Sequence, residues 1–574
     1  MRSTEVGKAA EAGERRRSGA GMTVDSGYAD IFGPQVPQTG DGGQTPTFAL
    51  ASAAYRDNPV EDIKKADNEW HQTAVNPGRS WAKIFRPNLG EAFSQAVIDR
   101  MLGVGRKPLI QSFGSEPQAV VEHCLAANRI RRERDQKLTG VMLLCGVLFL
   151  PGLLVWLLVF QLRATMGKLD NKRVSGVGTG LLVAVGALAV LFLVKMPFGG
   201  LVGWYARGCV VAPVAGWFLA KRICESTATD LRQRWDSLLA GSSVGAKVPE
   251  AVPTSPNQTA AEQLRQSLAR LSAEQQSNSV FYAGPKGILG MGTRWGAWHL
   301  AEELTPLDPV KGVHEFRSWT VVRAIHDQLK LLPRQSLKTG GFPPPSVRHW
   351  IVTPVGENAK AVARPEGTDV EAYQVKPRAI EDICNNQQFG GGDRHYLGVQ
   401  WPLWDGQLII TMLITVTVLH ETLRIEVTGH ALGPVNGLFT TKSEAPTKEV
   451  AKSVRFWETR TVKLPLVTAD EVVRLAARAT ISWYPPLLKW LGGSIGLPEP
   501  FGLRHAWADQ PWRHRFMADD ALRAATPVLR VVHTAAIRVL KEHDVDIDKF
   551  SSRSSALSGA VQDVSPRKAD SYDA

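Results

Sequence analysis

Cysteine is scarce in this chain, with five residues among 574. None of the five forms a CxxC pair, and their number is odd. Small secreted domains held by disulfides carry a much higher share of cysteine, and structural zinc sites place theirs in closely spaced pairs. The composition therefore excludes a disulfide scaffold and predicts no zinc site. The five are Cys124, Cys145, Cys209, Cys224 and Cys384.

The N-terminal segment is poor in aromatic residues and rich in Gly, Ser, Thr, Pro and charge. Stretches such as EAGERRRSGAG and QVPQTGDGGQTP cannot bury enough apolar surface to fold, so residues 1–60 are predicted to form a disordered arm. No apolar h-region follows the basic residues, which argues against a secretory signal peptide. The sequence leaves open whether translation starts at Met1 or Met22.

Charge is absent from two runs of 21 residues, 140–160 and 174–194. A helix needs about 20 apolar residues to cross the hydrocarbon core, whereas a buried helix of a soluble protein has about 10–14. We therefore predict transmembrane helices at 138–162 and 174–195. Pro151 is compatible with the first, because neighbouring groups can satisfy the carbonyl that it frees.

A third apolar stretch, 196–220, contains Arg207, two prolines and several glycines, so it either spans the bilayer or enters and returns. With three crossings the flanking cations number 6 on one side and 8 on the other. With two crossings they number 11 and 4, which satisfies the positive-inside rule. Hydropathy favours three spans and charge favours two. We expect a multi-pass protein of the cell membrane with its C-terminal region in the cytoplasm.

The net charge of +12 and the pI near 9.4 suit either nucleic acid or anionic lipid. Many of the clustered cations flank the apolar block, so the predicted partner is the lipid bilayer and nucleic acid is not expected. A protein partner stays open, because no recognition motif identifies one.

The remaining chain divides by composition and periodicity. Residues 61–137 are predicted as a helical region before the membrane and 221–240 as a helix leaving it. Residues 241–258 are rich in Gly, Ser and Pro, which is typical of a linker. Residues 259–545 predict a soluble α+β domain, and the Ser-rich residues 546–574 predict a disordered tail.

The clearest strand signal lies in residues 396–432. Asp405-Gly406 between two β-rich runs is typical of a hairpin turn. From 408 to 419 the even positions carry only Leu, Ile, Met and Val, while threonines recur on the odd face, as in a strand with one more buried face. Residues 423–432 alternate in the same way. The predicted fold is a membrane protein with two or three transmembrane α-helices plus a soluble α+β domain containing an antiparallel β-meander.

This order of segments resembles uncharacterised actinobacterial multi-pass membrane proteins. The likeness is carried by the apolar block, the FYAG…GMG turn, and the stretches RHYLGVQWPLWDGQLIITMLITVTV and LRIEVTGHALGPV. It extends over roughly residues 140–480. The resemblance implies residence in a membrane and carries no activity or catalytic residue.

The glycine-rich stretch FYAGPKGILGMGTRWGAWHL, residues 281–300, invites comparison with phosphate-binding loops. A Walker loop ends in Gly-Lys-Ser/Thr, and a dinucleotide fingerprint opens a helix. Here Arg294 follows Thr293, and TRWGAWHL predicts a strand. We interpret the stretch as a turn between two strands.

Three other motifs are equally incomplete. GGSIG around Ser494 lacks the preceding strand and following helix of an esterase nucleophile, and HETLR has Arg424 where a zincin has its second histidine. FGGGDRHY gathers Asp393, Arg394 and His395 after three glycines, which is ordinary loop chemistry but the first place to look for a site. The sequence thus identifies no catalytic or binding residue, no metal site and no cofactor.

The segment YPPLLKWLGGSIGLPEPFGLRHAW, residues 484–507, carries little charge, and Trp483, Trp490 and Trp507 lie in or beside it. Two interpretations stay open. The segment packs as a loop in the core, or it lies on the bilayer surface, where tryptophan is favoured.

These features predict a membrane-anchored cytoplasmic module for interaction or sensing. The alternative is a membrane-bound enzyme with a dispersed active site that the sequence does not reveal. A transporter or channel is less favoured, because the apolar segments contain no acidic residue and only one internal charge, Arg207.

Overall fold

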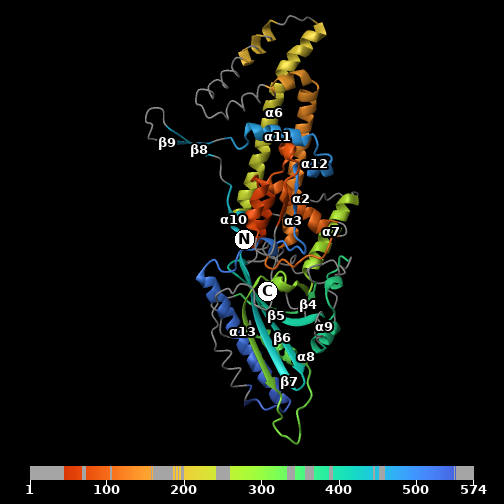
Figure 1. Cartoon of the computed structure of the whole chain (residues 1–574), viewed down its shortest axis with the longest axis vertical. Helices are drawn as coiled ribbons and strands as arrows, with labels where there is room; N and C mark the ends of the chain where they lie inside the picture. The colour runs from red at the N-terminus through yellow and green to blue at the C-terminus, as the bar shows by residue number, and fades with distance from the viewer. Residues whose placement is uncertain are drawn as a thin grey trace, which may run out of the picture.

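The computed structural model has an elongated shape, with a pair of helices projecting from one end and a β-sheet at the other (Figure 1). The helices of the N-terminal half lie between them. The described residues are 44–67, 73–103, 106–156, 158, 185–187, 189–191, 193–195, 200–240, 259–332, 343–355, 367–386, 392–443, 447–451, 459–463, 465–548 and 550. The predicted linker, 241–258, lies outside them.

The N-terminal half is helical. Its α-helices are α1 (Gln44–Ser52), α2 (Leu89–Leu102), α3 (Pro117–Val141), α6 (Gly200–Leu239) and α7 (Thr259–Gln275). Short 3₁₀ and π segments join them: η2 (Ala53–Tyr55), η3 (Val60–Ala66), η4 (Ser80–Phe85) and η5 (Met142–Val147). A short strand, β1 (Ala74–Asn76), completes this half.

The sheet has six strands in the order β2-β4-β5-β6-β7-β3. Their bounds are β2 (Ser279–Tyr282), β3 (Thr293–Glu303), β4 (Ser346–Pro354), β5 (Arg394–Leu403), β6 (Leu408–Leu419) and β7 (Thr422–Leu432). Only β2 and β4 pair in parallel, and every other neighbouring pair is antiparallel. The strands expected within 396–432 are thus present as consecutive neighbours, β5, β6 and β7. The turn between the first two has positive φ at Trp404, Asp405 and Gly406.

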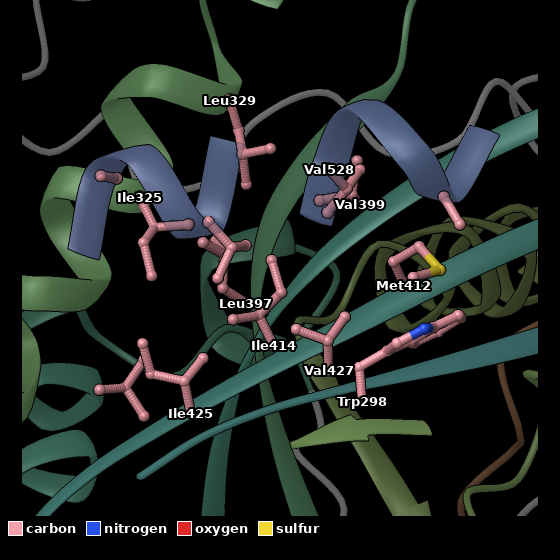
Figure 2. Close-up of a cluster of buried hydrophobic side chains, with 14 of the residues drawn as sticks. Trp298, Ile325, Leu329, Leu397, Val399, Met412, Ile414, Ile425, Val427 and Val528 are labelled. Atoms are coloured by element: carbon pink, nitrogen blue, oxygen red, sulfur yellow. The ribbon is translucent and has the colours of Figure 1, made fainter. Parts of the chain in front are cut away.

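Helices α8 (Ser318–Leu329) and α13 (Arg515–Glu542) cover one face of the sheet. The even positions of β6, expected to face the core, do so: Met412 and Ile414 are fully buried, with Leu397 and Val427 on the flanking strands. Figure 2 shows these side chains packed between the strands and α13, with Val528 of α13 among them. The apolar side chains at the even positions of β6 therefore form part of the main core.

The opposite face of the sheet is covered as well. Ile409 and Leu413, on the odd side of β6, are buried with Phe113 and with Trp350 of β4 in a second core cluster. Thr411, on the same side, is fully buried and accepts a hydrogen bond from Gln400 Nε2 at 3.0 Å. The odd face is thus more polar, as the sequence indicates, but it is also largely buried.

The two halves of the chain share a second large core, separate from the main core under the sheet. Residues of α1, α2 and α3 are buried together with Phe439, Phe501 and Trp507 from the C-terminal half. Strand β1 pairs with β10 (Ser494–Gly496), and Arg504 donates hydrogen bonds to the carbonyls of Phe113 and Gly114, both at 3.1 Å. The expected domain boundary near residue 259 therefore does not separate two independent cores.

The chain is ordered into helix earlier than its composition suggests. Residues 1–60 are expected to form a disordered arm, but α1 begins at Gln44, and Leu50 and Tyr55 are buried. The short run TFALASAAY supplies enough apolar surface to pack against α3 and α6. The composition averaged over residues 1–60 does not reveal this run, because the rest of the segment is polar. The predicted tail, 546–574, also begins too early, because Phe550 is buried in the main core.

The remaining elements connect these layers. They are η6 (Gly284–Lys286), η9 (Val370–Tyr373), α9 (Pro377–Asn385), α10 (Gly437–Thr440), β8 (Thr447–Ala451), β9 (Thr459–Lys463), α11 (Ala469–Ala479), α12 (Pro485–Gly492) and η10 (His505–Trp507). Strands β8 and β9 form a separate antiparallel pair. Helix α11 contacts both α3 and α6 where these helices leave the body of the molecule (Figure 1).

Candidate functional site

Exposed apolar side chains concentrate at the projecting end of the molecule. Of the 30 large hydrophobic residues that are exposed in the described part of the chain, 18 lie between Leu143 and Leu219. Leu201 is 88% exposed and Trp204 is 73% exposed. We call the described residues of 143–158 and 190–219 the apolar hairpin. Soluble monomers rarely expose a contiguous apolar surface of this kind, so it is a candidate surface for a membrane or a partner.

The two arms of the hairpin meet through small residues. At three glycines an added Cβ would collide with the opposite arm: Gly152 against the Cys209 backbone, Gly208 against the Phe149 ring and Gly216 against Cys145. The order of these contacts shows that the arms run antiparallel. Close approach at glycine is the common way in which helices associate within lipid, where burial of apolar surface provides no driving force.

No single helix among the described residues is both apolar and long enough to cross a bilayer. Two consecutive helical segments, Pro117–Val147 and Leu150–Trp156, are together long and apolar enough to cross, but they are bent by 98° relative to each other. The predicted spans 138–162 and 174–195 reach into residues 159–184, which lie outside the described part. They stay predictions.

The third apolar stretch is described from Gly200 onward. It forms the first half of α6, a helix of 40 residues that continues through the predicted helix 221–240 to Leu239. At 1.5 Å per residue, this helix is about 60 Å long, and its apolar half accounts for about 30 Å. Arg207, the one internal charge, lies with its guanidinium carbon 5.8 Å from the ring centre of Trp204.

A small core marks the level at which the hairpin leaves the body. Leu138 of α3 and Ala220 of α6 are buried there against Leu475 and Ala479 of α11. Thr139 donates a hydrogen bond through its hydroxyl to the carbonyl of Ala479 at 2.9 Å. The uncharged run of α3 begins at the next residue, so α11 crosses the hairpin at its base.

Below this level lies a buried cluster of charges that joins α2, α3 and α11. Arg478 donates from Nε to Glu91 Oε1 at 3.1 Å, and Arg134 donates from Nε to Asp135 Oδ1 at 2.8 Å. Arg131 donates to the carbonyl of Ala54 at 2.6 Å. All five side chains are buried. Three cations against two carboxylates give this cluster a formal charge of +1.

Electrostatics within the cluster favours ionised Glu91. Burial by itself raises the pKa of this carboxyl, but Arg478, Arg134 and Arg131 outweigh it and hold the pKa below its usual value. For Asp135, burial is stronger than its pairing with Arg134, and its pKa is raised. The ion pair between Glu91 and Arg478 therefore joins α2 to α11, although the two residues are 387 positions apart in the chain.

Three histidines form a second buried cluster, inside the sheet end. His326 lies on α8, His349 on β4 and His395 on β5, with exposed fractions of 4%, 1% and 0%. Nδ1 of His349 lies 2.9 Å from Nε2 of His395, a hydrogen-bonded pair of imidazoles. The ring centres of His326 and His349 are 4.8 Å apart. Burial lowers the pKa of His395 to about 3 and that of His349 well below its ordinary value.

Lowered histidine pKa values predict a loss of stability in mild acid. The ordinary pKa is 6.5, so between pH 6.5 and about 3 the unfolded chain binds protons that folded His395 does not. Each such group makes the unfolding free energy fall by about 1.4 kcal/mol per pH unit below pH 6.5. We expect His395→Gln to reduce this slope between pH 7 and 5, measured by denaturant unfolding of the detergent-solubilised chain. An unchanged slope would show that His395 is protonated in the folded state.

The sequence pointed to only one member of this cluster. Of the three residues after the glycines of FGGGDRHY, Asp393 and Arg394 are exposed, and only His395 points into the core. The other two histidines left a weaker signal, since His326 falls on the apolar face of an amphipathic helix and His349 within a buried strand. Within the described residues, no group of three His, Cys, Asp or Glu is arranged to hold a metal ion.

The glycine-rich stretch 281–300 is a turn between strands. Its four clustered glycines, at 284, 287, 290 and 292, all have positive φ, between 56° and 90°. Glycine adopts this conformation without steric cost, so the turn between β2 and β3 accounts for all four. The four glycines lead into strand β3 and not into the N-terminus of a helix that could bind a phosphate.

The two catalytic motifs also fall in the wrong structural context. Ser494 follows helix α12 and begins strand β10, the reverse of the strand-to-helix turn of an esterase. His420 and Glu421 form the turn between β6 and β7, with φ of 48° and 56°, so HETLR is not helical. Neither motif builds a site.

Comparison with known proteins gives one finding. No curated protein and no solved structure matches the chain. The region that one family model matches is just under half of the chain and contains most of the sheet, all three histidines of the buried cluster, and α11, α12 and α13. Residues 297–565 match the model of an uncharacterised family, the AbeC-like domain.

Proposed function

We propose that this chain is a multi-pass protein of the cell membrane, anchored in the bilayer by the apolar hairpin. The observation that carries the proposal is the concentration of exposed apolar side chains between Leu143 and Leu219. Elsewhere in the described part of the chain, most large apolar side chains are buried in cores. Transfer of apolar surface out of water stabilises by about 25 cal/mol per Å². A lipid environment removes this exposed surface from water without any change of fold.

The dimensions of the hairpin suit a bilayer. The apolar half of α6 is about 30 Å long, close to the thickness of the hydrocarbon core. The glycine contacts between its arms are those expected of helices packed in lipid. On this proposal the AbeC-like domain lies in the cytoplasm, as the distribution of flanking cations favours. We also propose that the chain is related to the actinobacterial multi-pass membrane proteins that its sequence resembles.

For the AbeC-like region we propose a role in interaction or sensing. The fold brings three titratable side chains together in this region, the histidines of the buried cluster. They are at most 4% exposed and pack inside the core. The alternative, a membrane-bound enzyme with a dispersed active site, would have to expose these imidazoles to a substrate. Their depressed pKa values and their mutual hydrogen bond favour a structural role.

Fractionation tests the anchor. We expect the chain to sediment with membranes and to resist extraction with alkaline carbonate, because its hairpin contacts hydrocarbon rather than the membrane surface alone. Val211→Asp, near the middle of the apolar half of α6, should lower the carbonate-resistant fraction, since a charge at the bilayer centre costs about 2.5–3.5 kcal/mol on insertion scales. Leu307→Asp, at an exposed leucine outside the hairpin, is the matched control and should change nothing.

Recovery of the unmodified chain in the soluble fraction without detergent contradicts the proposal. So does an equal loss of membrane retention in the hairpin variant and in the control, because the effect would then arise from unfolding.

A further inference from the structure

A second exposed apolar surface lies beside the base of the hairpin. Its members come from η4, from the two residues before α12 and from the outer face of α12. They are large: Trp483 is 79% exposed, Trp81 71% and Trp490 52%. We call this surface the aromatic platform. It consists of Trp81, Ile84, Trp483, Tyr484, Leu487 and Trp490.

The platform is a fixed surface. The inner face of α12 is anchored through Leu488 and Leu491, each 6% exposed. The backbone N–H of Arg79 donates to the carbonyl of Leu491 at 3.0 Å, which joins the segment before η4 to α12. The guanidinium carbon of Arg79 lies 4.9 Å from the ring centre of Trp490. The large side chains therefore stay exposed although the backbone beneath them is packed.

The level of the platform along the molecule follows from α11. That helix ends at Ala479, whose carbonyl accepts the hydrogen bond from Thr139, the residue before the uncharged run. Trp483 follows four residues later, and Figure 1 shows α12 at the level just below the projecting hairpin. The platform thus lies at the level at which the hairpin leaves the body.

The chemistry of the platform fits the boundary between water and hydrocarbon. Tryptophan and tyrosine are enriched at that depth because their rings are apolar while their N–H and O–H groups remain hydrated. The exposed cations Arg79 and Lys83 lie in and beside η4, where they suit anionic headgroups. A protein partner would also favour aromatic residues, but the level of the platform at the base of the hairpin, together with these cations, favours lipid.

We propose that the aromatic platform rests in the headgroup region of the bilayer and sets the depth of the AbeC-like region relative to the membrane. This inference rests on the proposed membrane anchor. It also selects between the two interpretations of residues 484–507: Trp507 packs fully in the core, whereas α12 presents Trp490 to the membrane surface.

The test is depth-dependent quenching in the full-length chain. A single cysteine is placed on the platform, Leu487→Cys on α12 or, independently, Ile84→Cys on η4. Val310→Cys, at a side chain 92% exposed between β3 and α8, is the control. Cys145→Ala and Cys209→Ala remove the half-buried native thiols, and the other three cysteines are buried. Each chain carries an environment-sensitive fluorophore and is reconstituted into phosphatidylcholine–phosphatidylglycerol vesicles with spin-labelled lipid.

We expect several-fold stronger quenching at positions 487 and 84 than at 310, and stronger quenching by a spin label near the headgroup than by one near the chain end. Equal and weak quenching at all three positions, in vesicles that carry the chain through flotation, overturns the platform and leaves the anchor intact. Stronger quenching by the chain-end label also overturns it, because the platform would then lie in hydrocarbon. Failure of the chain to float overturns the proposed anchor itself.

Discussion

Ile414→Asp is expected to abolish cooperative folding of the sheet end of the molecule. Ile414 is fully buried at the middle of β6, paired with Leu397 on β5 and Val427 on β7 (Figure 2). An unpaired carboxylate in such a site costs several kcal/mol, or binds a proton at a similar cost. A domain has a total stability of about 5–15 kcal/mol, so one substitution removes much of it.

Thr417→Val on the same strand is the matched control. Thr417 is half-buried on the opposite face, near the end of β6, and its replacement keeps the shape and the β-branched character of the side chain. We expect a change in unfolding free energy of no more than about 1 kcal/mol. The measurement is thermal unfolding of the detergent-solubilised full chain, followed by circular dichroism. Similar melting of Ile414→Asp and Thr417→Val would contradict the placement of Ile414 in the core.

The full chain is needed for this experiment because the C-terminal half contributes to a second core that it shares with the N-terminal helices. Residues 259–545 in isolation would expose Phe501 and Trp507, which are buried against α2 and neighbouring N-terminal helices. Arg504 would lose its two carbonyl acceptors at 113 and 114. Aggregation of such a fragment would thus follow from the missing N-terminal helices and would carry no information about β6.

Elements defined by local periodicity could be predicted from the sequence. The alternation in 408–419 and 423–432 gave β6 and β7 because one face of each strand meets the core that α8 and α13 complete. Asp405-Gly406 and the glycines of 281–300 could be predicted as turns because their backbones require positive φ. In these cases the physical constraint acts on residues that are neighbours in the chain.

Contacts between distant segments could not be predicted in this way. Nothing near Glu91 indicates that its partner is Arg478, and the short apolar run around Leu50 does not indicate which later helices bury it. The histidine cluster is of the same kind, since α8, β4 and β5 bring together three residues whose local surroundings differ. Such sites depend on strand order and helix docking, which one sequence does not encode as a periodicity.

The pair between Glu91 and Arg478 gives the second large expected effect. Arg478→Ala should destabilise the chain by about 3–5 kcal/mol, because removal of one partner leaves a buried carboxylate uncompensated. Glu91→Gln combined with Arg478→Met should cost less than Arg478→Ala alone, since no ionised group of the pair then remains buried. Arg424→Ala, at an exposed Arg–Glu pair with a separation of 3.0 Å, is the control and should cost about 0–1 kcal/mol.

Acid provides an independent readout of the same pair. The folded-state pKa of Glu91 lies below its usual value of 4.5, so its contribution is complete above that pH and is lost as pH falls through the folded-state pKa. The unfolding free energy of the unmodified chain should therefore fall with acid below pH 4.5 more steeply than that of Glu91→Gln. Equal acid slopes, or equal costs for Arg478→Ala and Arg424→Ala, would mean that α11 is held to α2 by packing alone. The steeper slope would assign to this ion pair the docking of α11 at the base of the hairpin.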